Sequence, residues 1–232
     1  DGVVTTSSYD ADDELTSISY SDGTMPSAQY TYDAAGRRLT MTDETGTTRY
    51  SYDGAGRLTA VTNGAGQAVA YGYDNLGQIV SITYPYGSRV TRSYDVAGRL
   101  RTVTDANDNT TSFGYDADGN LISTAYPNGV VDTTTVDAAD QVTGIAVTNS
   151  TNTLAGFGYT LTPSGLISAQ TDSVDSALST PVGYTQLDQV ATAGGADSYS
   201  YDPAGNITTL SNGSALAYDR AGQLTKLTPA SG

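Results

Sequence analysis

Hydrophobic and polar positions alternate in short runs along nearly the whole chain. Aromatic residues stand two apart in runs such as 50–52 and 71–73, with a small residue between them. Because residues two apart in a β-strand share a face, each run predicts a strand with one aromatic face. A second apolar run follows, as at 58–62. Its aliphatic positions Leu58 and Val61 are three apart, which indicates either a bulge or burial on both faces.

A turn motif joins the two predicted strands of each pair. It reads Tyr-Asp, two variable residues, Gly, a polar residue and an aliphatic residue. Asp can accept backbone N–H hydrogen bonds within a turn, and Gly supplies a positive φ. The clear copies place these structural positions at Tyr32, Asp33, Gly36, Tyr52, Asp53, Gly56, Tyr73, Asp74, Gly77, Tyr94, Asp95, Gly98, Tyr115, Asp116, Gly119, Tyr201, Asp202, Gly205, Tyr218, Asp219 and Gly222.

The motif recurs at a nearly fixed period. The tyrosines from Tyr32 to Tyr115 follow one another at intervals of 20, 21, 21 and 21 residues, and about eleven copies run from Tyr9 to Tyr218, degenerate over 136–190. A fixed period predicts one supersecondary unit, repeated and stacked. No stretch has helical apolar spacing. We therefore predict an all-β fold, an array of β-hairpins wound into a spiral or shell-like sheet. Residues 1–232 would form one array within a longer protein.

The composition limits the chemistry that this array can perform. The chain has 18 Tyr but no Trp, Cys or His. A Tyr-rich core must give its hydroxyls partners or access to water. Disulfides and every His-based catalytic or zinc site are excluded. No apolar run is long enough for membrane insertion.

The charge is strongly acidic and uneven. The net charge is −15, and residues 102–219 contain no Lys or Arg but thirteen Asp. A chain of this kind lacks the basic stripe that nucleic acid requires, and an anionic membrane surface would repel it. A solubilising surface is the simplest explanation, although the acidity also permits divalent cations.

Two acidic loops are candidates for calcium. Oxygen-bearing side chains alternate at Asp105, Asn107 and Asn109, and again at Asp116 and Asp118, as they do in calcium loops. Neither loop has the bidentate Glu at the twelfth position. Plain turns are favoured, so we expect no cofactor, with calcium as the alternative.

The tyrosines, with arginine beside them, offer the one route to catalysis and could also bind an anionic sugar. The candidate binding residues are Tyr84, Tyr86, Tyr126, Arg49, Arg89 and Arg92; the three tyrosines lie outside the paired aromatic runs. Exposed rings can stack on sugars, and arginines can neutralise a uronate. No catalytic residue is assigned. The repeat arginines Arg37, Arg57 and Arg99 are expected to pair with acidic residues of a neighbouring copy.

The motif resembles the YD repeat of the Rhs family, and residues 52–58 and 94–100 match it letter for letter. The family includes Rhs polymorphic toxins, the B–C cocoon of Tc toxins, wall-associated proteins and teneurins. The resemblance implies hairpins wound into a hollow shell that, in toxins, encloses a C-terminal effector released by aspartyl autoproteolysis. Here Asp202-Pro-Ala-Gly is similar to the cleavage segment, but Asn206 follows it, which favours an ordinary repeat.

We therefore expect a non-catalytic scaffold, shell segment or surface-interaction module of a secreted or cell-surface bacterial protein. Its partners would be the rest of a longer chain or an encapsulated cargo. One alternative is a carbohydrate-active module, binding or lyase, for an acidic polysaccharide. Another is a unit that self-assembles through open sheet edges.

Overall fold

The computed structural model describes residues 2–23, 26–176, 179–194 and 197–230. Contacts divide the chain into two units, Asp1–Thr111 and Ser112–Gly232. The one helical element with described bounds is the single 3-10 turn η1 (Pro85–Gly87). No helix within the described ranges has the length and apolar character needed to span a membrane.

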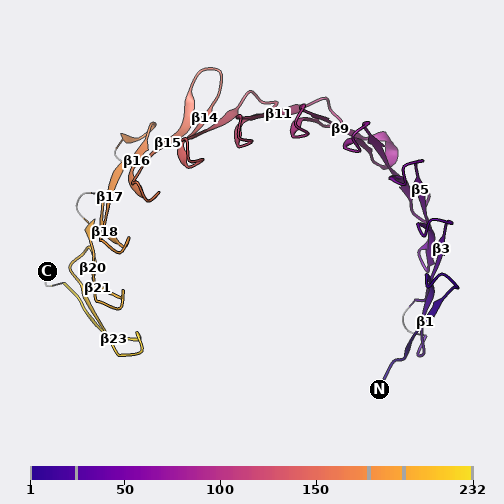
Figure 1. Ribbon diagram of the computed structural model, residues 1–232, viewed down its shortest axis with the longest axis horizontal. Coiled ribbons are helices and arrows are strands. Elements are labelled where there is room, and N and C mark those ends of the chain that lie inside the picture. The colour runs from indigo at the N-terminus through magenta and orange to yellow at the C-terminus, as the bar shows by residue number, and fades with distance from the viewer. Residues whose placement is uncertain (1, 24–25, 177–178, 195–196, 231–232) are drawn as a thin grey trace. The chain divides into compact units, whose positions relative to one another are not determined.

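The first unit is a run of antiparallel strands. Each strand from β1 to β10 pairs with the next one along the chain (Figure 1). The strands are β1 (Thr5–Tyr9), β2 (Leu15–Tyr20), β3 (Ala28–Tyr32), β4 (Arg38–Asp43), β5 (Gly46–Tyr52), β6 (Leu58–Thr62), β7 (Ala68–Tyr73), β8 (Ile79–Thr83), β9 (Arg89–Tyr94) and β10 (Leu100–Thr104).

The second unit continues the same plan. Strands β11 to β19 pair in chain order, and β20 to β23 form a four-stranded sheet. The strands are β11 (Thr110–Tyr115, which begins in the first unit), β12 (Leu121–Ala125), β13 (Val131–Val136), β14 (Val142–Thr148), β15 (Thr153–Leu161), β16 (Ile167–Asp172), β17 (Thr180–Tyr184), β18 (Val190–Ala193), β19 (Asp197–Ser198), β20 (Ser200–Tyr201), β21 (Ile207–Thr209), β22 (Ala215–Tyr218) and β23 (Leu224–Thr228). The predicted all-β array of hairpins is confirmed.

A β-bulge accompanies the Tyr position of each repeat. In β5–β6, Tyr50 is opposite Val61 while Tyr52 is opposite Leu58, so the register shifts by one residue. Equivalent shifts occur before Tyr32, Tyr73 and Tyr184. The bulge explains why Leu58 and Val61 are three apart in sequence yet share a face, and it decides between the two explanations that the sequence left open.

The two faces of the sheet differ in chemistry. We call the side bearing Tyr50, Tyr52, Leu58 and Val61 the aromatic face; its counterparts in other strands include Tyr71, Tyr73, Ile82 and Val90. We call the other side the small-residue face. On β5 to β10 it carries Ser51, Ala60, Thr62, Ala68, Ala70, Gly72, Ser81, Thr83, Thr91, Ser93, Thr102 and Thr104. Its hydroxyls bond across strands, as between Thr31 and Thr40 at 2.6 Å.

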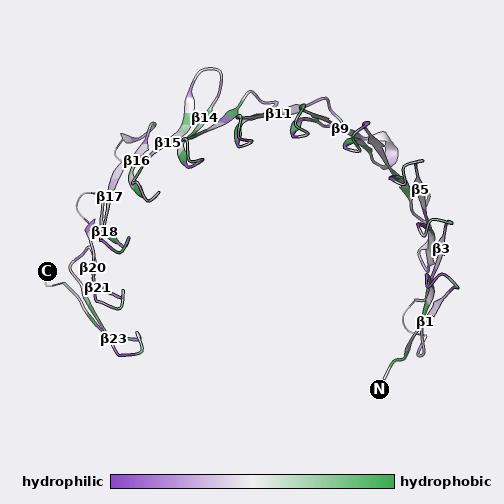
Figure 2. Ribbon diagram, viewed as in Figure 1, coloured by the Kyte–Doolittle hydropathy of each residue, from purple (hydrophilic) through white to green (hydrophobic). Residues whose placement is uncertain are grey.

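Neither unit has a buried hydrophobic core. Among the described residues no hydrophobic side chain is buried, and most of the aromatic face is half-buried. Figure 2 shows hydrophobic positions spread along successive hairpins. The accessible surface is 14746 Å². Two separate compact domains, each of half this mass, would expose only about 12,000 Å² together. Each hairpin therefore depends on its neighbours and leaves both faces of the sheet uncovered.

Candidate functional site

The repeat turn is the best-defined local structure in the chain. At Asp53 the backbone N–H donates to the Arg57 carbonyl at 2.9 Å, and the Gly56 N–H donates back to the Asp53 carbonyl at 2.9 Å. Asp53 Oδ1 also accepts the N–H groups of Ala55 and Arg57, both at 2.9 Å. Gly56 has a φ of 83°, which a side chain would strain. The repeated Asp therefore stabilises a turn, as the sequence predicts.

The tyrosine hydroxyl connects each repeat to the one before it. Tyr52 Oη donates to the Arg38 carbonyl at 2.9 Å, and Tyr73 Oη donates to the Leu58 carbonyl at 2.7 Å. Equivalent bonds are made by Tyr32, Tyr94, Tyr184 and Tyr201. These bonds supply the partners that a Tyr-rich sheet needs, and they hold adjacent hairpins together at the turn.

The sequence analysis predicted the wrong acidic partner for the repeat arginine. Arg57 Nε pairs with Asp53 Oδ2 of its own turn at 2.7 Å, not with an acidic residue of a neighbouring copy. The five-residue turn places the two side chains side by side. Arg37 and Arg99 pair in the same way with Asp33 and Asp95.

The arginine instead reaches the next copy through a ring and a carbonyl. The Arg57 guanidinium lies 4.6 Å from the centroid of the Tyr73 ring, and its Nη1 donates to the Asp74 carbonyl at 3.0 Å. Arg37 lies over Tyr52 at 4.9 Å. The hydrogen-bonded N–H of Arg57, followed by its guanidinium, holds the pKa of Asp53 below its ordinary value. A single polar position thus completes its own turn and contacts the next.

The candidate binding residues are not gathered at one place. Arg49 and Arg89 lie on the small-residue face of β5 and β9, with three strands between them, whereas Arg92 lies on the aromatic face. Tyr126 belongs to the second unit, where its hydroxyl donates to Asp132 Oδ2 at 2.8 Å. This contact raises the pKa of Tyr126.

Tyr84 and Tyr86 lie together in the turn Tyr84–Ser88, next to Arg89. The Tyr84 N–H donates to the Ser88 carbonyl at 2.7 Å, so the turn has the same backbone pattern as the repeat turns but lies at the other end of the strands. Tyr86 is 92% exposed and Tyr84 is 44% exposed. Of the predicted binding residues, the structure brings together Tyr84, Tyr86 and Arg89.

The predicted calcium ligands are occupied within their own turns. Asp105 Oδ1 accepts the N–H groups of Asn107 and Asn109, and Asp105 Oδ2 accepts Asn109 Nδ2 at 3.0 Å. Asp116 is engaged similarly by Asp118 and Asn120. In the part of the chain that the structure describes, no group of three or more His, Cys, Asp or Glu could hold a metal. Calcium binding stays a prediction that no contact here tests.

Two features were missed by the sequence analysis. Arg38 lies on the aromatic face between the rings of Tyr30 and Tyr50, at 4.8 and 6.0 Å from their centroids. The doubled Arg37-Arg38 was its only signal.

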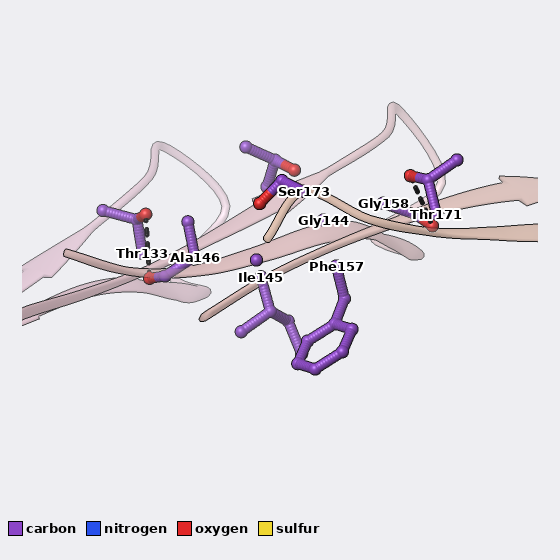
Figure 3. A pocket seen from close by; sticks show the side chains of 10 residues that line it. Thr133, Gly144, Ile145, Ala146, Phe157, Gly158, Thr171 and Ser173 are labelled. Atoms are coloured by element: carbon purple, nitrogen blue, oxygen red, sulfur yellow. Dashed lines mark hydrogen bonds between the residues drawn. The ribbon is translucent and has the colours of Figure 1, made fainter. Parts of the chain in front are cut away.

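The second feature is a hollow of about 290 Å³ on the small-residue face of β13–β16. Figure 3 shows Thr133, Thr171 and Ser173 on this side of the sheet, with Ile145 and Phe157 on the other. Glycines at alternate positions of β15, Gly156 and Gly158, were the signal for it. The lining has no charged group. The hollow therefore has no charged side chain that could bind an ion or act as an acid or base.

The fold and the repeat turn define a class, a hairpin-repeat protein in which a Tyr-Asp-x-x-Gly turn joins the two strands of each copy. Comparisons with known proteins agree. The Teneurin YD-shell family matches residues 3–105, and the RHS Repeat family matches residues 94–131. No curated protein sequence matches the chain. Residues 3–131 of the chain are thus similar to the YD-shell and RHS-repeat families.

Solved structures show the same fold. The TcdB2-TccC3-TEV crystal structure matches with a TM-score of 0.58 and 15% identity, covering 99% of this chain and 17% of that one. A mutant of the Photorhabdus luminescens Tc holotoxin pore matches at 0.59 and 16%, with the same coverage. TcdB2-TccC3 without its hypervariable C-terminal region matches at 0.58 and 16%, covering 97% and 14%. The chain thus spans about a sixth of the length of these proteins.

Proposed function

We propose that this chain is a stretch of wall in a protein shell, built by a longer YD-repeat chain and non-catalytic in itself. One observation carries the proposal: among the described residues the sheet buries no hydrophobic side chain. A sheet with an aromatic face open to water needs a cover, because exposed apolar patches of this extent mark interaction surfaces. The cover would be other parts of the parent chain or an enclosed polypeptide.

The difference between the two faces supports a wall. One face is mostly aromatic and aliphatic, and the other is mostly Ser, Thr, Ala and Gly, with Arg49 and Arg89 among them. A free-standing ribbon surrounded by solvent on both sides has no need for such a contrast. A wall separates two environments, and each face can suit its own.

The wall can be tested by labelling single cysteines, since the chain has none of its own. Val61→Cys places a thiol on the aromatic face of β6, and Thr62→Cys places one beside it on the small-residue face. Both should react with a polyethylene-glycol maleimide in the isolated chain. In the intact parent protein we expect one of the two to be protected. Equal reactivity of both in the parent would contradict a closed wall.

Export to the cell surface or the medium belongs to the same proposal. A shell that holds a second polypeptide apart is useful to a cell that delivers the enclosed chain elsewhere, and two of the structural matches bear the names of Tc toxin components. Fractionation of the producing cells with an antibody to this chain tests it. Recovery of all the protein in the cytosol would contradict export.

The lyase alternative loses its expected centre. Clustering of Arg49, Arg89 and Arg92 on one face would favour a lyase, but Arg49 and Arg89 have three strands between them, and Arg92 lies on the opposite face from Arg89. Self-assembly through the outer strands stays a prediction. Size-exclusion chromatography with light scattering tests it: a monomer of 23.9 kDa would contradict assembly, and larger species would support it.

A further inference from the structure

Arg38 places a charged side chain at a position that is aliphatic in the neighbouring copies. It lies on the aromatic face of β4, opposite Tyr32 of β3. The residues at the same place in the next three copies are Leu58, Ile79 and Leu100. An arginine guanidinium therefore lies on the aromatic face where these copies carry only apolar groups.

The surroundings of Arg38 do not satisfy all of its hydrogen-bond donors. The guanidinium lies between the rings of Tyr30 and Tyr50, at 4.8 and 6.0 Å from their centroids. Burial disfavours the charge, but hydrogen bonds to the hydroxyls of Tyr50 and Tyr32 raise the pKa of Arg38. Its Nε is buried without a hydrogen-bond partner, the one such side-chain atom found among the described residues. Because buried polar atoms in folded proteins are nearly always paired, the uncovered sheet leaves this side chain incompletely bonded.

No carboxylate in the described part of the chain pairs with Arg38. The ion pairs found there belong to other arginines, namely Arg37, Arg57 and Arg99. Strands β1–β10 contain one acidic residue, Asp43, which lies at the opposite end of β4 and accepts hydrogen bonds from Thr45. At Arg38 the aromatic face thus carries a cation with no carboxylate beside it.

A cover over this face would change the cost of the Arg38 charge. The side chain is half-buried in the open sheet, and a segment packed on the aromatic face would remove its remaining contact with water. A guanidinium that loses water without gaining an anion is strongly destabilising. A carboxylate offsets this cost, because its two oxygens match the planar guanidinium in a bidentate, charge-assisted pair. A segment that covers Arg38 therefore needs a carboxylate at this point.

We propose that Arg38 is the docking point for an Asp or Glu side chain of a polypeptide segment outside residues 1–232. Around its carboxylate the segment is apolar, because the neighbouring positions of the aromatic face are Tyr30, Met41 and Tyr50. This inference rests on the wall function, since the segment is the cover that the wall requires. It adds the chemistry by which the wall recognises that cover.

Carbodiimide cross-linking of the intact parent protein tests the proposal. In Arg38→Lys the reagent activates a carboxyl group in contact with the new amine, the amine attacks, and an amide bond forms while the carbodiimide takes up the water as a urea. Peptide mass spectrometry should show a link between position 38 and an Asp or Glu outside residues 1–232. Arg49→Lys, exposed on the small-residue face of β5, is the matched control and should not link to that segment. No link, or links to residues 1–232 alone, would overturn the proposal.

Arg38→Leu keeps the fold and removes the docking point. It introduces the aliphatic residue of the neighbouring copies, so the melting temperature of the 232-residue chain should be equal to or above that of the unmodified chain. In the parent protein the same change leaves the carboxylate of the cover unpaired. Maleimide labelling of Val61→Cys, opposite Tyr50 on the aromatic face, should then speed up at least about tenfold, whereas Arg38→Lys should keep the rate within about threefold.

Failure of this inference can be told apart from failure of the wall function. A Val61→Cys thiol that is protected in the parent, with a labelling rate that Arg38→Leu leaves unchanged, would overturn the docking point and leave the wall function intact. Protection of Thr62→Cys alone would do the same, since the small-residue face would then be the covered one. Equal reactivity of both thiols would overturn the wall function, and the docking point with it.

Discussion

At the scale of single residues, the Tyr, Asp, Gly and polar positions of the repeat each make a defined contact or adopt a defined conformation. The Tyr hydroxyl bonds to the preceding copy, the Asp carboxylate accepts N–H groups of its turn, and the Gly takes a positive φ. The polar residue after Gly reaches forward, as Arg57 does to Tyr73 and Gln78 does to the Gly98 carbonyl at 2.8 Å. Two of these contacts join copies and two shape the turn.

The hydrogen bond of the repeat tyrosine predicts a difference in the free energy of unfolding between variants of two neighbouring tyrosines. Tyr73→Phe removes the hydrogen bond to the Leu58 carbonyl and should lower the free energy of unfolding by about 1 kcal/mol. Tyr71→Phe, on the same face of β7, is the matched control because no hydrogen bond of its hydroxyl is found in the described structure. Urea denaturation followed by circular dichroism measures both. Equal losses would show that the Tyr73 hydroxyl contributes nothing specific.

The conformation of the turn glycine predicts a difference in stability between two glycine variants of the same turn. Gly56→Ala forces a side chain into a φ of 83° and places its Cβ 3.2 Å from Arg37 Nη1, so we expect a loss of about 1–2 kcal/mol. Gly54→Ala in the same turn has open space and no positive φ, and it should be neutral or slightly stabilising. Thermal melts compare the two variants. A Gly56→Ala protein as stable as Gly54→Ala would refute the role of Gly56.

At the scale of the hairpin, the sequence predicted the element types and the repeated turns from Tyr-x-Tyr alternation and the position of Gly. Its error was the acidic partner of the repeat arginine, which lies in the same turn and not in a neighbouring copy. The pairing of Arg57 with Asp53 depends on the geometry of the turn, which cannot be read from the sequence. In the degenerate copy the turn is Thr162–Leu166, with Leu161 in the place of Tyr. Tyr159 lies two residues earlier, on β15.

The turn aspartates predict sensitivity to acid. Hydrogen bonds from the Arg57 and Arg99 N–H groups, with their guanidinium groups, lower the pKa of Asp53 and Asp95; for Asp33 the Arg37 side chain is the larger cause. A folded pKa below the unfolded value gives stability that is present above the unfolded pKa of about 4 and is lost as pH falls through the folded pKa. The melting temperature should therefore stay level from neutral pH to about pH 5 and fall below about pH 4.

The control for this acid transition is the triple variant Asp33→Asn, Asp53→Asn, Asp95→Asn. Asn keeps an acceptor for the turn N–H groups but cannot form the ion pairs with Arg37, Arg57 and Arg99. We expect a lower melting temperature at pH 7 and a shallower fall in acid. Acid slopes that are the same in both proteins would mean that other groups govern the transition.

At the scale of the whole molecule, the strands of each unit pair only with their neighbours in chain order, apart from the break between β19 and β20. Stability in such arrays is close to a sum of repeat terms and nearest-neighbour terms, without one shared core. The absence of a buried hydrophobic side chain among the described residues agrees with this account. Damage to one hairpin should therefore remain local.

Hydrogen exchange can test this locality with variants of one turn. Gly56→Ala strains the turn between β5 and β6, so amide protection should fall there and in the flanking strands β4 and β7. Protection in β13–β16 of the second unit should be unchanged, because no hydrogen bond of those strands involves the altered turn. Gly54→Ala should leave both regions as in the parent. A loss spread evenly over both units would instead reveal one cooperative transition that includes both of them.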